Sequence, residues 1–388
     1  MEAFPGATQA SPLSDPGDGG HPRDRLLSVF DLEGPPAVPD SDVTAVVLCH
    51  NEARRLPYFL THHKALGIGH FIVVDNDSDD GSGAILDADP DVTRLFTTRP
   101  YSEYKSIWRE AIADYYLEGR WICFPDVDEL LVYPGWPDRS LPEYCEILDE
   151  GGYDALFTTM VDMYPDRPLS QCHYEAGQSF IDVAPYFDTG NYRLVPLKPK
   201  QFKGWATPRV RIAGGARERL FHRHAAQSGT FLDRLIAKTV FSLRRSMEPG
   251  PRRRELDVRA VERLERFQDP VAPPAMCKVP LVRWRQGTRF RGGVHRMDLA
   301  YRLAPDWGCL LHFKYFDDFG DKAVTAVSRG QHAGGAEHYQ RYLSKVDDVS
   351  DRSLLFRGSR RFTGVRSLIS AGLMRDRLRP ARRRWLPF

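Results

Sequence analysis

Two aspartates one residue apart, Asp126 and Asp128, are the side chains in this sequence best placed to do chemistry. They follow the apolar run 121–124, and apolar residues resume at 130. Side chains two apart in an extended backbone point the same way, so both carboxylates would be directed at one point at the end of a strand. A hard divalent cation takes such oxygen ligands. The pattern predicts a metal site, although surface loops also carry it by chance.

The segment upstream predicts the elements that would position these aspartates. The β-branched run 43–48 predicts a buried parallel strand, and 71–74 predicts a second one. Between them, apolar residues at helical spacing predict a helix over 56–66, and a further helix is expected over 101–117. Ligands of open α/β sheets bind at the carboxyl ends of strands. Three polar loops are therefore expected on one rim: 51–52, 75–80 and 126–129.

The order of these motifs resembles the inverting family 2 glycosyltransferases and their relatives in family 92. The resemblance rests on VVLCHNEARRL, ALGIGHFIVVDNDSDDGS and WICFPDVDELLV, within 43–132. It continues more loosely through VDMYPDRP, GGARERLF, KVPLVRW and LLHFKYFDDFG, which resemble a bacterial subgroup. It implies an α/β fold of glycosyltransferase-A type, with a mostly parallel nucleotide-binding sheet flanked by helices in a single main domain. It also implies a nucleotide-diphospho-sugar donor and a Mn²⁺ or Mg²⁺ ion.

The same resemblance implies which residues bind the nucleotide sugar. The loop after the first strand and the acids after the second strand hold the nucleotide, while the first aspartate of the DVDE motif binds the ribose. An arginine in GGARERLF is suited to a phosphate or an acidic acceptor through forked hydrogen bonds, or to a solvated ion pair. Capping of the following helix is an equal alternative for the acid of the NE loop. The residues expected to bind are Asn51, Glu52, Asp75, Asn76, Asp126 and Arg217.

For the metal, the resemblance implies Asp128 as a direct ligand and Asp126 as a ligand that reaches the ion directly or through water. Glu129 is expected to brace the loop. A histidine from a later strand often completes the metal shell, which makes His295 and His312 candidates. A hydrogen-bonded core position is the alternative for each of them.

The catalytic base of an inverting transfer is expected to be a carboxylate near the acceptor, because one proton must leave the attacking hydroxyl. Asp162 ends a strand-like run and is the first candidate, followed by Glu218 and then Asp317. The acid pair usual in family 2 is not evident at the expected place.

The composition is that of a globular enzyme, with 42% hydrophobic and 27% charged residues in 388. No apolar run reaches the length that a transmembrane helix needs. The first residues lack an apolar signal core, and six scattered cysteines predict a reducing, cytoplasmic setting without zinc.

The domain boundaries follow from composition. Residues 1–40, rich in Pro, Gly, Asp and Ser, predict a disordered extension. A glycosyltransferase-A domain is expected over 41–350, with a nucleotide and metal half (41–135) and an acceptor half (150–320). Residues 351–388 form the last segment, which from Arg352 onward holds eleven arginines and one acid, Asp376, among apolar residues. They predict a basic amphipathic tail, suited to the inner membrane face or to covering an acidic body. Nucleic acid is not expected, because aromatic residues in the tail are few.

Together these features predict a metal-dependent glycosyltransferase that moves a sugar, with inversion, to a glycan or lipid-linked acceptor in cell-surface polysaccharide synthesis. Two alternatives stay open. A nucleotidyltransferase would use Arg54 and Arg55 on a triphosphate, but the loop lacks the glycine-rich sequence that such enzymes carry. A non-catalytic module would bind the nucleotide or sugar without turnover.

Overall fold

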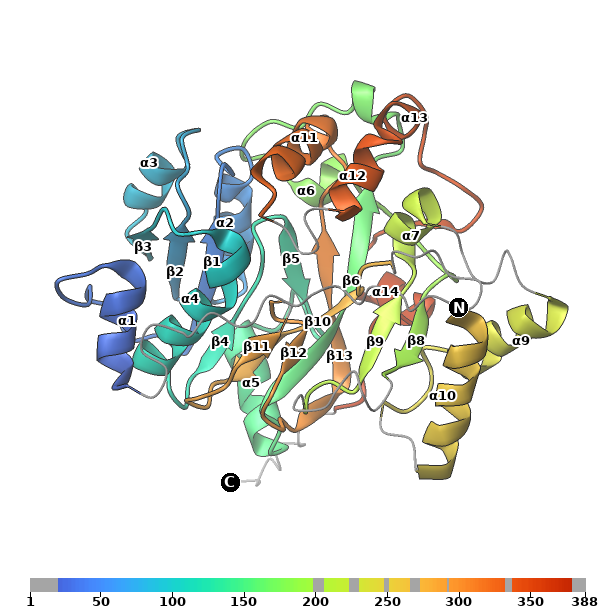
Figure 1. Ribbon diagram of the computed structural model, residues 1–388, viewed down its shortest axis with the longest axis horizontal. Coiled ribbons are helices and arrows are strands. Elements are labelled where there is room, and N and C mark those ends of the chain that lie inside the picture. Colours follow the sequence, from blue (N-terminus) through green and yellow to red (C-terminus); the bar gives the residue numbers. More distant parts are fainter. Residues whose placement is uncertain are drawn as a thin grey trace, which may run out of the picture.

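The computed structural model describes residues 20–197, 206–222, 230–247, 251–265, 273–291, 293–331 and 337–378. Within them, ten strands form one sheet, and helices pack around it (Figure 1). The sheet has the order β14-β7-β6-β10-β4-β1-β2-β3, and β13 joins β6 to β5. The predicted α/β fold with a central sheet flanked by helices is confirmed.

The first half of the sheet is parallel. Strand β1 pairs in parallel with β2 and β4, and β2 pairs in parallel with β3. Every residue of β1 and β2 is buried, as expected for strands covered on both faces. These strands are β1 (Val43–Cys49), β2 (His70–Asp75), β3 (Val92–Phe96) and β4 (Trp121–Cys123).

Antiparallel pairs enter in the second half. Strand β10 runs antiparallel to both β4 and β6, whereas β13 is parallel to β6 and antiparallel to β5. The strands are β5 (Glu129–Val132), β6 (Ala155–Tyr164), β7 (Tyr186–Asp188), β10 (Cys277–Arg283), β13 (Leu303–His312) and β14 (Ser359–Arg361). Two small pairs lie apart from the sheet: β8 (Arg193–Pro196) with β9 (Val210–Ala213), and β11 (Phe290–Arg291) with β12 (Arg296–Met297).

The helices divide between the two halves of the sheet. Figure 1 shows the first four around β1–β3, and α9 and α10 at the opposite end of the molecule. The first group is α1 (Pro22–Phe30), α2 (Leu56–Ala65), α3 (Ser82–Asp87) and α4 (Tyr101–Tyr116). The others are α5 (Leu141–Glu150), α6 (Phe180–Val183), α7 (Gly215–Phe221), α9 (Phe231–Val240), α10 (Pro251–Glu265), α11 (Phe319–Arg329), α12 (Glu337–Leu343), α13 (Val346–Ser350) and α14 (Val365–Ala371).

The predicted disorder of residues 1–40 is wrong for Pro22–Phe30, which form α1; residues 1–19 lie outside the described part of the chain. Helix α1 packs on α4, where the Arg25 guanidinium pairs with Glu110 at 3.1 Å and Asp114 at 2.8 Å. Leu26 and Val29 are buried beside them. The composition missed this helix because its stability comes from tertiary contacts more than from propensity.

The predicted basic amphipathic tail, residues 351–388, is part of the domain fold as far as residue 378. Strand β14 pairs with β7, and α14 follows it. The apolar side chains of this tail divide: five are buried in the core, and three are exposed. The buried ones are Leu354, Phe362, Leu368, Leu373 and Met374, and the exposed ones are Leu355, Phe356 and Ile369. The last apolar candidates, Trp385 and Phe388, lie outside the described residues.

Two further features bear on the expected setting of the protein. All six cysteines are free and buried. In the described part of the chain, no helix combines the length and the apolar character needed to cross a membrane.

Candidate functional site

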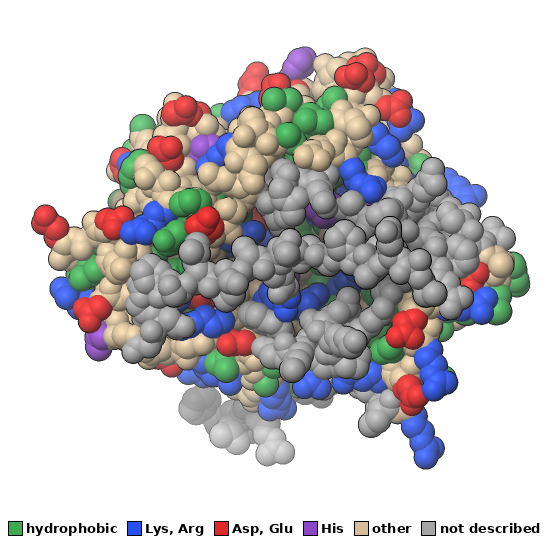
Figure 2. Space-filling view, in the orientation of Figure 1, with side chains coloured by type: hydrophobic (Ala, Val, Ile, Leu, Met, Phe, Trp, Pro, Cys, Tyr) green, Lys and Arg blue, Asp and Glu red, His purple; other side chains and the backbone are tan. Residues whose placement is uncertain are grey.

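A cavity of about 610 Å³ opens at the carboxyl edge of the parallel half of the sheet. Two of the three polar loops predicted to meet there line it, those at 51–52 and 126–129, together with α11. Figure 2 shows Lys and Arg side chains in the hollow near the middle of this face. The predicted site residues that the structure brings to this cavity are Asn51, Glu52, Asp126, Asp128, Arg217, His295 and His312.

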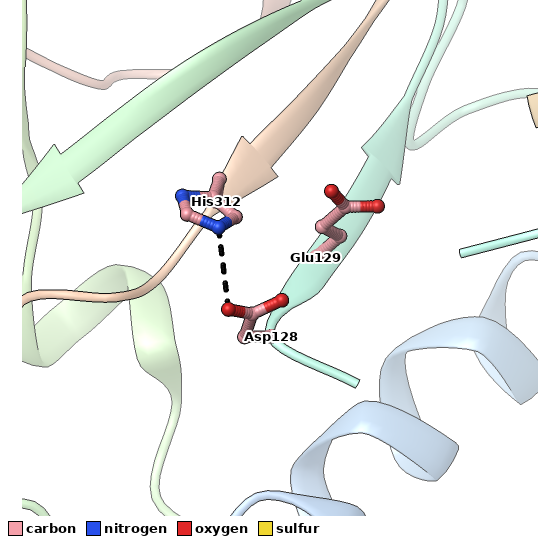
Figure 3. A group of neighbouring side chains, drawn as sticks. All are labelled: Asp128, Glu129 and His312. Carbon is pink, nitrogen blue, oxygen red and sulfur yellow. Dashed lines mark ion pairs between the residues drawn. The ribbon is translucent and has the colours of Figure 1, made fainter. Parts of the chain in front are cut away.

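Three of the lining residues form a group with the geometry of a metal site. Ligand atoms of Asp128, Glu129 and His312 all lie within 4.8 Å of one another (Figure 3). Strand register creates the group, because β13 places His312 opposite Glu129 of β5 and also opposite Asp162 of β6. A single position of β13 thus faces a carboxylate on each neighbouring strand.

His312 is oriented by two carboxylates. Its Nδ1 lies 2.9 Å from Asp162 Oδ1, and its Nε2 lies 3.2 Å from Asp128 Oδ2. A carboxylate that holds one ring nitrogen and leaves the other for a metal is the usual outer partner of a histidine ligand. Burial favours the neutral ring, but the charge and hydrogen bond of Asp128 outweigh it and raise the pKa of His312. A bound cation would displace this proton.

The two aspartates of the DVDE motif have different partners, which corrects the expectation that they point together. Residues 127–128 form a turn, so the alternation of an extended strand does not apply. Asp126 pairs with Arg109 at 2.9 Å and with Lys278 at 2.5 Å. Burial opposes its ionisation, but these cations outweigh burial and lower the pKa of Asp126 to about 2. Asp126 is not part of the metal-type group.

The chemistry of the donor set fits a divalent cation, with two carboxylates and one imidazole. Although burial raises the pKa of Asp128, His312 and nearby cations hold it well below its usual range, so this ligand is ionised. Glu129 also accepts from Lys278 Nζ at 2.7 Å and from the backbone N–H of Asp126 at 3.1 Å. Glu129 was expected only to brace the loop; the structure adds it to the candidate ligands.

His295 lines the cavity but lies outside this group. Its Nδ1 is 2.6 Å from the Cys277 carbonyl oxygen. Burial and the neighbouring Lys278 lower the pKa of His295 to about 4, so the ring is neutral. Of the two histidine candidates, the structure therefore brings His312 to the carboxylates.

The residues expected to bind nucleotide divide into two pairs. Asn51 and Glu52 line the cavity, and Glu52 pairs with Lys322 of α11 at 2.6 Å. Asp75 and Asn76 do not line it. Asp75 is fully buried and holds Arg94 at 2.8 Å, while the Asn76 amide donates to the backbone at Thr97 and Arg99. The positions of Asp75 and Asn76 argue against direct ligand contact.

Burial also argues against both carboxylates predicted to act as the base. Asp162 is fully buried, and it holds both Arg217 and His312. Burial raises its pKa, but Arg217 and His312 lower it far more, which makes Asp162 a poor proton acceptor. Glu218 is 2% exposed, accepts two hydrogen bonds from Arg193, and does not line the cavity. The third candidate, Asp317, is held by Arg54.

Sequence reasoning missed several cations of the cavity. Lys314 lies two residues beyond His312, a spacing that could have suggested a shared side of the chain. Lys322 and Arg329 are seven apart on α11, so helical spacing places them on one face. Both spacings were visible in the sequence. The sequence did not show, however, that the two segments line the same cavity, because the fold brings them together.

Fold and site together define an α/β protein with an acid–histidine group of metal-binding type beside a cation-lined cavity. No protein-family model matches the chain. Over 92 residues, 23% of the chain, it is 30% identical to a glycosyltransferase family 92 protein of Oryza sativa subsp. japonica, and it spans 16% of that relative's length. This similarity supports a relationship to glycosyltransferases.

Among solved structures, the chain resembles 4-diphosphocytidyl-2C-methyl-D-erythritol synthase with a TM-score of 0.23 and 14% sequence identity. That match covers 36% of this chain and 66% of the other. A likeness at this level carries no argument about activity.

Proposed function

We propose that the protein is a metal-dependent glycosyltransferase of glycosyltransferase-A type, similar to family 2 and family 92. It transfers a sugar with inversion from a nucleotide-diphosphate donor to a glycan or lipid-linked acceptor, and we place it in cytoplasmic steps of cell-surface polysaccharide synthesis. The observation that carries the proposal is the group Asp128, Glu129 and His312, which faces a cation-lined cavity at the carboxyl edge of the sheet.

The metal would be held by Asp128, Glu129 and His312. Two carboxylates favour Mg²⁺ or Mn²⁺, and the imidazole shifts the preference toward Mn²⁺. When bound, such an ion neutralises the charge that develops on the leaving diphosphate. Asp162 fixes the ring of His312 at 2.9 Å and so acts as a positioning residue for this ligand.

Lysine and arginine side chains around the cavity support a phosphate-bearing substrate. Lys322 and Arg329 project from α11, and Lys314 follows the metal-type histidine. Neutral or cationic ligands would gain nothing from these charges, whereas a diphosphate needs compensating charge on being desolvated. Asn51 and Glu52, on the loop after β1, line the same cavity and would bind the nucleotide there.

The structure does not favour the nucleotidyltransferase alternative. It would need Arg54 and Arg55 for a triphosphate, but Arg55 forms two hydrogen bonds to Asp318, at 2.7 and 2.8 Å, and Arg54 pairs with Asp317. Both arginines are therefore engaged in fixing α11 to the loop after β1.

Thermal-shift measurements with UDP, GDP, CDP and ADP, each with Mn²⁺ or with EDTA, test the proposal. One diphosphate should stabilise the protein only with metal, by about 2.7 kcal/mol at a concentration of 100 times its Kd. Turnover of the corresponding nucleotide sugar then separates a transferase from a binding module. Absence of a metal-dependent shift with all four nucleotides would count against the proposal.

A further inference from the structure

A second, smaller cavity of about 220 Å³ adjoins the first. The two share a wall that includes Asp126, Arg217, Lys278 and Lys314. Lys105 and Arg109 of α4 line only the smaller cavity. A group bound there would lie next to the proposed donor, while the metal-type residues Asp128, Glu129 and His312 line only the larger cavity.

The charge of the smaller cavity is strongly unbalanced. Asp126 is the one acid among its described lining residues, against five cations. Asp126 is already engaged by Arg109 and Lys278, so it does not offset the rest. The lining cations are Lys105, Arg109, Arg217, Lys278 and Lys314.

Two of these cations, Lys105 and Lys314, make no ion pair within 4.0 Å in the described part of the chain, although Asp126 and Asp128 act on them from farther away. The Lys105 ammonium contacts the Tyr101 ring, with 5.4 Å from Nζ to the ring centroid. Lys314 donates to the Tyr339 hydroxyl at 3.0 Å. Burial, and then the charge of Arg109, lower the pKa of Lys105, and Asp126 offsets them only in part, as expected where positive charge is in excess.

Arg217 supplies an independent sign of a missing anion. The residue is 7% exposed, and its Nε pairs with Asp162 at 3.0 Å. Its Nη2, however, is buried without a hydrogen-bond partner in the described structure. Since an unsatisfied buried donor costs about 1–3 kcal/mol, and more when charged, a ligand oxygen at this nitrogen would be favoured.

We propose that the smaller cavity is the acceptor subsite and that the acceptor carries an anionic oxygen group, a phosphate or a carboxylate, near the hydroxyl that reacts. This rests on the proposed transferase function. Lys105, Lys314 and Arg217 Nη2 bind the anion, while the adjoining larger cavity holds the donor. Desolvated ion pairs of this kind select charged acceptors over neutral ones of the same shape.

The test measures binding of glycerol 3-phosphate, glycerate and uncharged glycerol to the full-length chain, by calorimetry in EDTA at constant ionic strength. Glycerol 3-phosphate and glycerate distinguish a phosphate from a carboxylate. Lys105→Gln removes a charge from the smaller cavity alone, and Lys322→Gln removes one from the larger cavity alone. Lys105 makes no ion pair in the described structure, so its replacement should preserve folding.

We expect one anion to bind and glycerol not to bind. Lys105→Gln should weaken the anion about tenfold, the effect of losing roughly one such contact, and leave Mn²⁺-dependent nucleotide binding unchanged. Lys322→Gln should weaken Mn²⁺-dependent nucleotide binding and leave binding of the anion unchanged. After the nucleotide screen identifies the donor, Lys105→Gln should raise the acceptor KM about tenfold with kcat nearly unchanged.

Three results would overturn the inference: equal binding of the anions and glycerol, anion binding that is insensitive to Lys105→Gln, or loss of nucleotide binding in that variant. The last would place the donor diphosphate in the smaller cavity. Failure of the proposed function has a different signature, because no nucleotide would then bind with Mn²⁺ to the unmodified protein.

Discussion

Two polar regions meet at the large cavity, and their side chains have different partners. In the loops after β1 and β2, the polar groups satisfy one another. The side-chain amide of Asn51 donates to the Asp79 carboxylate and accepts from the Asp79 backbone N–H, and Asp80 accepts from the backbone of Ala53. Asp75 below them is neutralised by Arg94. These contacts fix the loop after β1, whose Asn51 and Glu52 line the cavity, against the loop after β2.

In the group formed by β5, β6 and β13, the partners leave ligand atoms facing the cavity. Asp162 holds His312 and Arg217 from behind, so the Nε2 of the histidine and the Nη2 of the arginine are directed elsewhere. The comparison shows that acidic residues near each other in the sequence cannot be assigned as metal or nucleotide ligands from their residue type alone. What matters is whether an acid is fully occupied by hydrogen bonds and ion pairs to its neighbours, or whether it orients a neighbouring ligand.

The strongest test of this contrast is a paired substitution. Asp128→Asn should reduce Mn²⁺-dependent nucleotide affinity by on the order of 100-fold or more, because loss of an outer partner alone costs 10–100-fold. Asp77→Asn is the matched control, since Asp77 is an exposed loop residue whose φ of 61° asparagine tolerates. Calorimetric titration with Mn²⁺ and nucleotide checks both. Equal effects of the two substitutions would remove the distinction between the regions.

Asp162→Asn should have the next largest effect. We expect Mn²⁺ affinity to fall about 10- to 100-fold, because His312 loses its orienting carboxylate. Stability should fall by about 3 kcal/mol, because Arg217 loses its buried counter-ion. Metal titration and urea unfolding measure the two effects. Unchanged metal affinity together with lost turnover would restore Asp162 as the catalytic base.

For the first region, Asp75→Asn should affect stability rather than binding. The change removes a charged, buried partner of Arg94 and should cost about 2 kcal/mol. The affinity for nucleotide and Mn²⁺ should stay at the wild-type value. Urea unfolding and calorimetry separate the two quantities, and a variant with normal stability but weak nucleotide binding would show that Asp75 is a ligand.

The smallest effect concerns His62 of α2, which links the regions through a hydrogen bond to the Leu131 carbonyl of β5 at 3.0 Å. Burial lowers its pKa to about 4 from 6.5. The unfolded chain therefore binds more protons between these values, and stability falls as the pH falls from 6.5 toward 4. Between pH 7 and 5.5 the loss should be on the order of 1 kcal/mol. His62→Gln should flatten this part of the stability–pH curve, and an unchanged slope would contradict the assignment.

The sequence predicted most of the first half because its signals are local. The predicted strand 43–48 is Val43–Cys49, and the predicted helix 56–66 is Leu56–Ala65. Single strands and helices of this kind carry their own periodicity.

The site could be predicted only in part, because its geometry is non-local. The pairing of His312 with Asp162 spans 150 positions and depends on the register of β13 against β6. Nothing near Asp162 in the sequence distinguishes an acid that orients a histidine from one that accepts a proton. The turn at 127–128 likewise separates Asp126 from Asp128, although their spacing alone suggested a shared ligand.

The six buried thiols have a practical consequence. Only a thiolate reacts rapidly with alkylating reagents, and burial raises the pKa of Cys49 to about 12 and that of Cys309 well above its usual value. The thiols of the folded protein should therefore react very slowly with maleimides. The rate at which they are labelled then measures how often the core opens. A single cysteine introduced on the surface of α11 would accept a fluorophore selectively and follow ligand binding without removal of the native thiols.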